Sequence, residues 1–396
     1  MKIYKNINVF DEALNRIERI YNEFENVVVS VSGGKDSTVI FNLALMVAKK
    51  LNRLPVRVMF VDQEAEWEAT IDQIRNIMYR DDVEPYWYQM PIKLFNATSV
   101  TEHWLYCWEE GKEWMREKDE IAIKENIYGE ERFARLFIKI PEVEYPNEPV
   151  AYLTGMRTDE CHMRLIGLTQ GVTYKDITWG KVLNKKKNHY TFHPIYDWSY
   201  SDVWKAIFDN KWEYNEIYNK YYMDGVPFSK MRISNLHHEK SVYSLFYLQR
   251  YEPHTYEKLV KRLSGIDMAS KFGEDQYFIR NLPFMFSDWK EYRDYLTENL
   301  LPEEYRESFR KKFAEIDEKI KYFINQNSKD KLYKAEIQSI LTNDWEFVKL
   351  NDCLRRPDVT FCFKFLEGKR NWESLSEEDK KKVRREDFGK LQKTTS

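Results

Sequence analysis

The chain has few of the residues that build disulfide scaffolds or cysteine-rich metal sites. It contains only four cysteines among its 396 residues, and no two of them form a Cys-x-x-Cys pair. This count excludes a disulfide framework and argues against a cysteine-rich zinc or iron–sulfur site. We therefore expect no iron–sulfur cluster, and a reducing, cytoplasmic environment.

Long apolar runs and an excess of one charge are also absent. No segment approaches the length of a membrane span, and the N-terminal stretch carries charges throughout, unlike a signal peptide. The net charge is −3, so no global positive field indicates nucleic acid. Aromatic residues, in contrast, make up 16% of the chain. They favour packing between helices over base stacking or partner surfaces.

The apolar patterns that are present alternate between strand and helix. The sequence predicts strands over Val27–Val31, Val56–Val61 and Val83–Met90, and helices over Phe10–Phe24, Ser37–Leu51 and Trp67–Tyr79. Pro85 weakens the third strand. Such alternation is typical of a doubly wound, mostly parallel sheet, so we predict an α/β fold.

The rest of the chain predicts an insertion and a helical region. We expect further strands over Pro149–Thr154 and Tyr190–Ile195, a helix over Ser201–Asn210 capped by Ser201, a helical stretch over Thr101–Asn126, and a solvated helix or tail over Leu375–Lys393. Beyond Trp212 the pattern is almost entirely helical. The predicted domains are a nucleotide-binding domain, 1–210, with a helical insertion near 93–146, and an α-helical region, 211–396.

One loop carries the clearest chemical signal. The first strand ends in Ser32-Gly33-Gly34-Lys35-Asp36-Ser37 and runs directly into a helix. Two glycines let a ligand approach the main chain, the helix start presents free N–H groups, and Lys35 adds a positive charge. Walker A is excluded because Asp36 follows Lys35 where Ser or Thr is required, and the Gly-x-Gly-x-x-Gly fingerprint is missing. The sequence predicts a phosphate cradle.

This loop resembles the pyrophosphate-binding loop of the ATP pyrophosphatase (PP-loop) superfamily. Two further elements, TGMRTDECHMR with Gly155 and Arg157, and HPIYDWSYSDVW with Pro194 and Trp198, are similar to those of phosphoadenosine phosphosulfate (PAPS) reductases. The resemblance covers about residues 27–210. It implies an adenine nucleotide alpha hydrolase-like sheet.

Within that group the chain looks most like proteins typified by immunoglobulin-binding regulator A. Those proteins are described as co-activators of gene expression that act beside a ParB/sulfiredoxin-like protein, so the resemblance implies such a partner. It also implies ATP or PAPS as the nucleotide, with Mg²⁺. The residues expected to hold the nucleotide are Ser32, Gly33, Gly34, Lys35, Asp36, Ser37, Gly155 and Arg157.

Lys35, Arg157 and Asp62 are the expected catalytic residues, and each of the acidic candidates has an alternative role. Asp36 and Asp62 are the candidate Mg²⁺ ligands. Asp36 could instead cap the helix, and Asp62 or Glu64 could contact ribose or be ordinary polar residues at a strand end. Arg157 suits a phosphate, but a surface ion pair with nearby acids is the alternative.

The implied reaction is attack of an acceptor oxygen on the α-phosphorus of ATP, which gives an adenylated product and pyrophosphate. A PAPS reductase also needs a C-terminal Glu-Cys-Gly-x-His segment, which this sequence lacks. Sulfur transfer by an atypical cysteine (Cys161, Cys353 or Cys362) is therefore an alternative. A third hypothesis is a regulator gated by nucleotide without turnover.

Histidines and lysines give weaker signals. The pairs His189/His193 and His237/His238 favour ordinary hydrogen bonding over a metal site. Lys185–Lys187 could contact phosphates of a nucleic acid or of a second nucleotide, although a solvated loop is favoured.

Overall fold

A computed structural model gives the fold of the chain. The described residues are 6–99, 102–160, 162–169, 171–228, 231–233, 235–237, 242–277, 281–320, 326–355, 359 and 376–377. Within these ranges no helix combines the length and apolar character that crossing a bilayer requires. The helix or tail predicted over Leu375–Lys393 lies outside them, apart from Ser376 and Glu377.

The chain forms two compact units. The first comprises Met1–Leu94, Trp104–Leu236 and Ser244–Arg262, and the second comprises Phe95–His103, His237–Tyr243 and Leu263–Ser396. Residues 211–236 and 244–262 thus belong to the unit that contains the large sheet. The division of the chain into domains at residue 210 stays a prediction.

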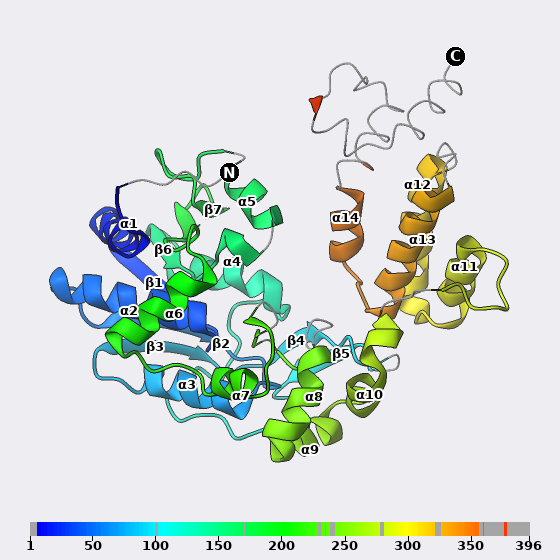
Figure 1. Ribbon diagram of the computed structural model, residues 1–396, viewed down its shortest axis with the longest axis horizontal. Helices are drawn as coiled ribbons and strands as arrows, with labels where there is room; N and C mark the ends of the chain where they lie inside the picture. Colours follow the sequence, from blue (N-terminus) through cyan, green and yellow to red (C-terminus); the bar gives the residue numbers. More distant parts are fainter. Residues whose placement is uncertain are drawn as a thin grey trace. The chain divides into compact units, whose positions relative to one another are not determined.

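A six-stranded sheet forms the centre of the first unit (Figure 1). Its strands lie in the order β3 (Val83–Tyr88), β2 (Val56–Val61), β1 (Asn26–Ser30), β6 (Val150–Leu153), β8 (His189–Phe192) and β7 (Gly180–Asn184). Neighbouring strands are parallel except β7 and β8, which are antiparallel. The predicted α/β fold with a mostly parallel sheet is confirmed.

The strand order reverses between β1 and β6. From β1 the chain moves outward through β2 to β3, and it returns later to the other side of β1 as β6. Val29 of β1 pairs with Leu153 of β6. The segments that follow these two strands therefore start next to each other, at the carboxyl ends of the strands. This is the position where open α/β sheets bind ligands.

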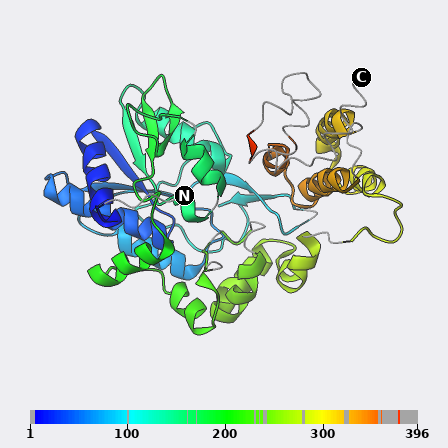
Figure 2. The ribbon, with the colours of Figure 1, turned by 45° about the horizontal axis from the view of Figure 1, so that its top comes forward.

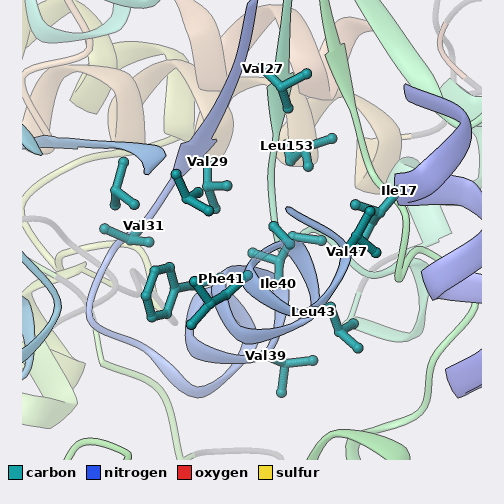
Figure 3. Packing of buried hydrophobic residues seen from close by; sticks show 14 of the residues in the cluster. Ile17, Val27, Val29, Val31, Val39, Ile40, Phe41, Leu43, Val47 and Leu153 are labelled. Carbon is teal, nitrogen blue, oxygen red and sulfur yellow. The ribbon is translucent and has the colours of Figure 1, made fainter. Parts of the chain in front are cut away.

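Helix α2 (Lys35–Lys50) follows β1 and packs on the sheet beside α1 (Val9–Glu23) and α6 (Tyr200–Asn210). Figures 1 and 2 show the two blue helices α1 and α2 side by side. In the close view of Figure 3, Val29 and Leu153 of the sheet lie over Ile40 and Val47 of α2. These side chains are buried, which anchors the start of α2 at the end of β1.

The other elements of the first unit lie around this core. They are α3 (Glu68–Met78), α4 (Phe133–Glu144), α5 (His162–Thr169), α7 (Ile217–Met223), α8 (Val242–Tyr251), α9 (Pro253–Arg262), the short helix η1 (Thr158–Glu160), and a two-stranded sheet of β4 (Ile92–Phe95) and β5 (Trp104–Cys107). Strand β3 is an edge strand, which explains why it tolerates Pro85.

The predicted helix over Thr101–Asn126 is wrong. Residues 104–107 form β5 instead, and among the described residues of the predicted insertion the α-helix is α4, further along the chain. Leu105 and Cys107 are buried while Tyr106 between them is exposed, which is the alternation of a strand. The density of charge and tryptophan suggested a helix, but the period of two decides the structure.

The predicted N-cap of α6 is also wrong by two residues. The cap is Ser199, whose backbone N–H donates to the Asp202 carboxylate at 2.7 Å while its hydroxyl accepts from the Asp202 N–H at 3.3 Å. This reciprocal pair is a capping box. It requires a side chain that accepts a hydrogen bond three positions after the serine, and Asp202 satisfies that spacing for Ser199 but not for Ser201.

The second unit is helical over α10 (Ile266–Tyr277), α11 (Trp289–Asn299), α12 (Glu303–Ile320), α13 (Gln326–Leu341) and α14 (Val348–Leu354). Arg293 of α11 is buried and donates to Asp317 of α12 and to Glu336 of α13, each at 2.8 Å. Burial raises the pKa of Glu336 to about 8. One arginine thus ties three helices together, and the helical region that the sequence predicted is confirmed.

Gly155 should be essential for packing at the point where β6 meets α2. A Cβ at this position would lie 2.5 Å from the carbonyl oxygen of Asp36, and backbone cannot yield as a side chain can. We expect Gly155→Ala to lower the free energy of unfolding by about 1–3 kcal/mol in urea denaturation. Gly167→Ala is the matched control, because its Cβ would meet open space. Equal stability of the two variants would contradict this prediction.

Candidate functional site

The loop between β1 and α2 is shaped by its glycines. Gly33 has a φ of +69°, and a Cβ there would lie 2.6 Å from the methyl group of Thr70 in α3. Gly34 is the N-cap of α2 and supplies no side-chain cap. The N–H groups of the first helical turn have no acceptor within the helix, so this helix start favours a bound anion.

The two serines of the loop have different roles. The buried Ser37 hydroxyl donates to the Gly34 carbonyl oxygen at 2.9 Å and accepts from the Ser32 N–H at 3.1 Å. Ser32 is exposed, and its hydroxyl lies 3.3 Å from that of Ser37. Ser37 therefore holds the loop closed, while Ser32 presents its hydroxyl at the surface of the loop.

Asp36 joins the two cationic residues that the sequence singled out. Its carboxylate accepts from Lys35 Nζ at 3.0 Å and from Arg157 Nε at 2.6 Å. The side chains of Lys35 and Arg157 are only 9% and 3% exposed, so both charges are held in a partly desolvated place. The alternative in which Asp36 caps α2 is wrong, because the helix has no side-chain cap.

Arg157 reaches this place from the segment after β6. Its guanidinium also donates to the Trp198 carbonyl oxygen at 3.3 Å and to Glu160 at 3.4 Å. Trp198 belongs to the third motif, so the structure brings together all three elements that the sequence analysis selected. The arginine is buried rather than at the surface, but it does pair with the nearby acids Asp159, at 3.7 Å, and Glu160. Its role at a phosphate therefore stays a prediction, and so does the ion-pair alternative.

Two residues at the loop escaped the sequence analysis. The hydroxyl of Tyr218 in α7 accepts from the Lys35 N–H at 3.1 Å, and its ring lies beneath the Lys35 ammonium, 5.4 Å from ring centroid to nitrogen. The Asn215 side chain donates to the Gly33 carbonyl oxygen at 3.3 Å and to Thr70 at 3.0 Å. Both follow the third motif within twenty residues, but no spacing in EYNEIYNKYY indicates a loop contact.

Asp62 is buried directly after β2, and among the described residues it forms neither a hydrogen bond nor an ion pair with the loop. Its carboxylate accepts from Trp87 Nε1 and Gln89 Nε2, each at 3.0 Å, and from the Glu64 N–H at 2.9 Å. It also forms an ion pair with Arg116. A metal ion at Asp62 would have to displace these donors, so its catalytic and metal-binding roles stay predictions.

Glu64 is fully buried in a similar way. Its carboxylate accepts from Arg262 at 2.8 Å and from the backbone N–H groups of Trp108 and Met115 at 2.6 and 3.2 Å. Protein donors thus satisfy this carboxylate, as they do that of Asp62, and both acids hold the segment after β2 in place. A contact of either acid with ribose stays a prediction.

The histidine pairs do not form metal sites within the described residues. His189 Nε2 bonds to the Tyr145 carbonyl oxygen at 3.0 Å, and His193 Nδ1 bonds to Thr154 at 2.7 Å. Burial lowers the pKa of His193 to about 4, which keeps it neutral. His237 is buried, and His238 lies outside the described residues.

Lys185–Lys187 form the turn between β7 and β8, and Lys187 donates to the Glu142 carbonyl oxygen at 3.1 Å.

The described ranges contain no ready-made metal site. No group of three or more His, Cys, Asp or Glu side chains within them is arranged to hold a metal ion. Mg²⁺ that arrives with phosphates needs only one or two protein carboxylates. Asp36 beside the loop suits that smaller requirement.

Comparison with known families assigns the part of the chain that contains this site. Residues 26–224, half of the chain, match the phosphoadenosine phosphosulfate reductase domain. The chain belongs to this family. Residues 225–357 match a domain of unknown function (DUF3440). Among curated proteins, the uncharacterised protein YbdN of Escherichia coli (strain K12) is 29% identical over 79% of this chain and 81% of its own length.

Solved structures give weak similarities. FMN adenylyltransferase of Candida glabrata, with FMN and an ATP analogue, has 15% identity and a TM-score of 0.34 over 55% of this chain and 64% of that enzyme. PAPS reductase of Candida auris has 14% identity and a TM-score of 0.31 over 60% and 98% of the two chains. The chain thus spans less than two thirds of the first enzyme, and neither similarity carries an argument about function.

This member of the PAPS reductase domain family has no exposed cysteine near the loop among its described residues. Burial raises the pKa of the Cys107 thiol well above its usual value, which keeps it protonated. Cys353 is half-buried in α14. Cys161 and Cys362 lie outside the described residues, so sulfur transfer by an atypical cysteine stays a hypothesis. Similarity to immunoglobulin-binding regulator A likewise stays a prediction.

Glu66 is a buried acid that the sequence analysis missed. It is 6% exposed and lies in the segment between β2 and α3. Burial, and then the nearby charge of Asp62, raises its pKa to about 8. Only its position two residues after Glu64, in a segment that also contains Asp62, could have indicated it.

Glu66 should make stability fall as pH rises. Between its ordinary pKa of 4.5 and about 8, the folded chain binds more protons than the unfolded chain, so the free energy of unfolding decreases through this interval. We expect Glu66→Gln to reduce this decrease, measured by urea denaturation from pH 5 to pH 9. The exposed Glu120→Gln should leave it unchanged. An unaltered pH dependence in Glu66→Gln would contradict the prediction.

Proposed function

We propose that the chain binds ATP through the β1–α2 loop and transfers the AMP moiety to an acceptor, releasing pyrophosphate. The observation that supports this proposal is the convergence of Lys35 and Arg157 on the Asp36 carboxylate at the start of α2. Two desolvated cations, a glycine loop and a helix start together match a group with several negative charges. Pyrophosphate is such a group.

The proposed reaction balances as a displacement at phosphorus. An acceptor oxygen forms a bond to the α-phosphorus, the bond from the α-phosphorus to the bridging oxygen breaks, and pyrophosphate leaves with the electron pair. The acceptor proton passes to solvent. The side chains of Lys35 and Arg157, and the first-turn N–H groups of α2 other than that of Lys35, would stabilise the charge that develops on the leaving group.

Asp36 is the proposed ligand for Mg²⁺, which supplies further positive charge to the phosphates when it is bound. In the present arrangement the carboxylate neutralises Lys35 and Arg157. Bound phosphates would take over both cations and leave Asp36 available to the metal. Ser32, Ser37 and Gly155 complete the proposed phosphate site.

Two other functions fit the same loop. The chain could bind PAPS in place of ATP and transfer sulfur. Its membership of the PAPS reductase domain family supports this alternative. A regulator that binds nucleotide without turnover, as a co-activator with a ParB/sulfiredoxin-like partner or with nucleic acid, would also retain the loop. The partly buried cation pair favours chemistry at phosphate over these two, because binding alone does not require desolvated charge at a scissile bond.

Turnover of ATP with Mg²⁺ tests the proposal directly. We expect AMP and pyrophosphate as products, separated by ion-exchange chromatography, and a loss of about 100-fold or more in Lys35→Ala and Arg157→Ala. The exposed Lys205→Ala in α6 is the control and should retain the rate. ADP and phosphate as products would refute α-phosphate chemistry. Nucleotide binding without any product would favour the regulator.

Asp36→Asn separates the metal-binding role from simple neutralisation. Loss of the carboxylate frees both cations, so we expect pyrophosphate to bind about 3- to 10-fold more tightly without Mg²⁺. We also expect Mg²⁺ to lose its effect on binding, measured by isothermal titration calorimetry. Asp159→Asn, which removes a more distant carboxylate, 3.7 Å from Arg157, is the control. Equal stimulation by Mg²⁺ in Asp36→Asn and the native chain would exclude Asp36 as the ligand.

A further inference from the structure

The hydroxyl of Tyr218 occupies an unusual position at the phosphate loop. It accepts the N–H of Lys35, the first residue of α2, at 3.1 Å. That N–H is one of the groups that a helix start offers to an anion. The side chain is only 4% exposed, so its hydroxyl has been taken out of water to reach this place.

In this contact the Tyr218 hydroxyl acts only as a hydrogen-bond acceptor. A phenol can also donate its proton, and buried polar groups normally form hydrogen bonds, but the proton of Tyr218 has no acceptor among the described residues. Burial, and then the nearby charge of Asp36, raises the pKa of Tyr218, so the phenol keeps its proton at neutral pH. The loop therefore contains a buried donor that is still available.

Neighbouring contacts hold the ring in place. Trp204 of α6 packs edge-on against it, with centroids 5.2 Å apart, and the Lys35 ammonium lies 5.4 Å from its centroid. A Cβ added to Gly34 would lie 3.4 Å from the hydroxyl oxygen, so the phenol is close to the loop backbone. Asn215, three residues earlier, bonds to the Gly33 carbonyl oxygen and secures the same segment.

From this geometry we infer that Tyr218 is a direct ligand of the bound pyrophosphate moiety, to which its hydroxyl donates a hydrogen bond. The N–H of Lys35 polarises the phenol oxygen and strengthens its proton as a donor. The inference deepens the proposed function and rests on it. It makes recognition of the β- and γ-phosphates depend on α7, beyond the loop and the Arg157 segment.

Binding of ATP, inorganic pyrophosphate and AMP to Tyr218→Phe tests the inference by isothermal titration calorimetry. A hydrogen bond to a charged acceptor corresponds to a factor of about 10 or more in Kd. We expect ATP and pyrophosphate to lose this factor and AMP, which has neither β- nor γ-phosphate, to bind unchanged. Tyr221→Phe, on the same helix and also buried, is the matched control and should bind all three as the native chain does.

The outcomes separate this inference from the proposed function. Failure of the native chain to bind ATP and pyrophosphate would overturn both. Unchanged or tighter pyrophosphate binding in Tyr218→Phe would overturn the inference alone, because the hydroxyl would then be neutral or a competitor for the Lys35 N–H. Equal weakening of ATP and AMP would show a structural role and would also overturn it.

A second substitution keeps the test decisive if Tyr218→Phe does not fold. Replacing Tyr218 by 3-fluorotyrosine retains the hydroxyl and makes its proton more acidic. Tighter pyrophosphate binding at a pH where the phenol is protonated would support donation to phosphate. Unchanged or weaker binding would overturn it.

Discussion

The parallel pairing of β1 with β6 is the constraint on which the candidate site depends. It places the carboxyl ends of two strands that are far apart in sequence next to each other, with Val29 opposite Leu153. The glycine loop leaves from one end, and Arg157 follows the other. Without this pairing Asp36 could not hold Lys35 and Arg157 together. The close approach of Gly155 to the Asp36 carbonyl shows how little space separates the two segments.

Buried ion pairs stabilise the segment that follows the neighbouring strand, β2. The carboxylates of Asp62 and Glu64 pair with Arg116 and Arg262, whose side chains are 8% and 7% exposed. Breaking one partner of such a pair would leave an uncompensated charge in a poorly solvated place. These residues therefore bind the segment after β2 to residues near 116 and to the end of α9, and they give the loop a rigid neighbour.

Sequence patterns predicted the elements that lie on short, regular repeats. The apolar run of Val27–Val31, the glycine loop and the helix after it all lie within one continuous stretch, so local propensities and loop chemistry suffice to identify them. The segment around β5 was misread because its charges and tryptophans concealed an alternation of only four residues. Ser199 was missed in favour of Ser201 because either serine can begin a helix until the partner acid is considered.

The sequence alone was enough to predict a phosphate site, because the glycines, the helix start and the cation that suit an anion are adjacent in the chain. Arg157 could be named from its motif, but its contact with Asp36 arises from strand order. Tyr218 and Asn215 have no local signal, since their importance comes from burial and from partners more than a hundred residues away. Glu66 follows two other acids in the chain, but only folding buries it. Asp62 shows the converse: a strand-end acid in sequence becomes a buried partner of Arg116 once the chain is folded. Tertiary packing decides which distant polar groups come into contact, and a local sequence pattern does not contain that information.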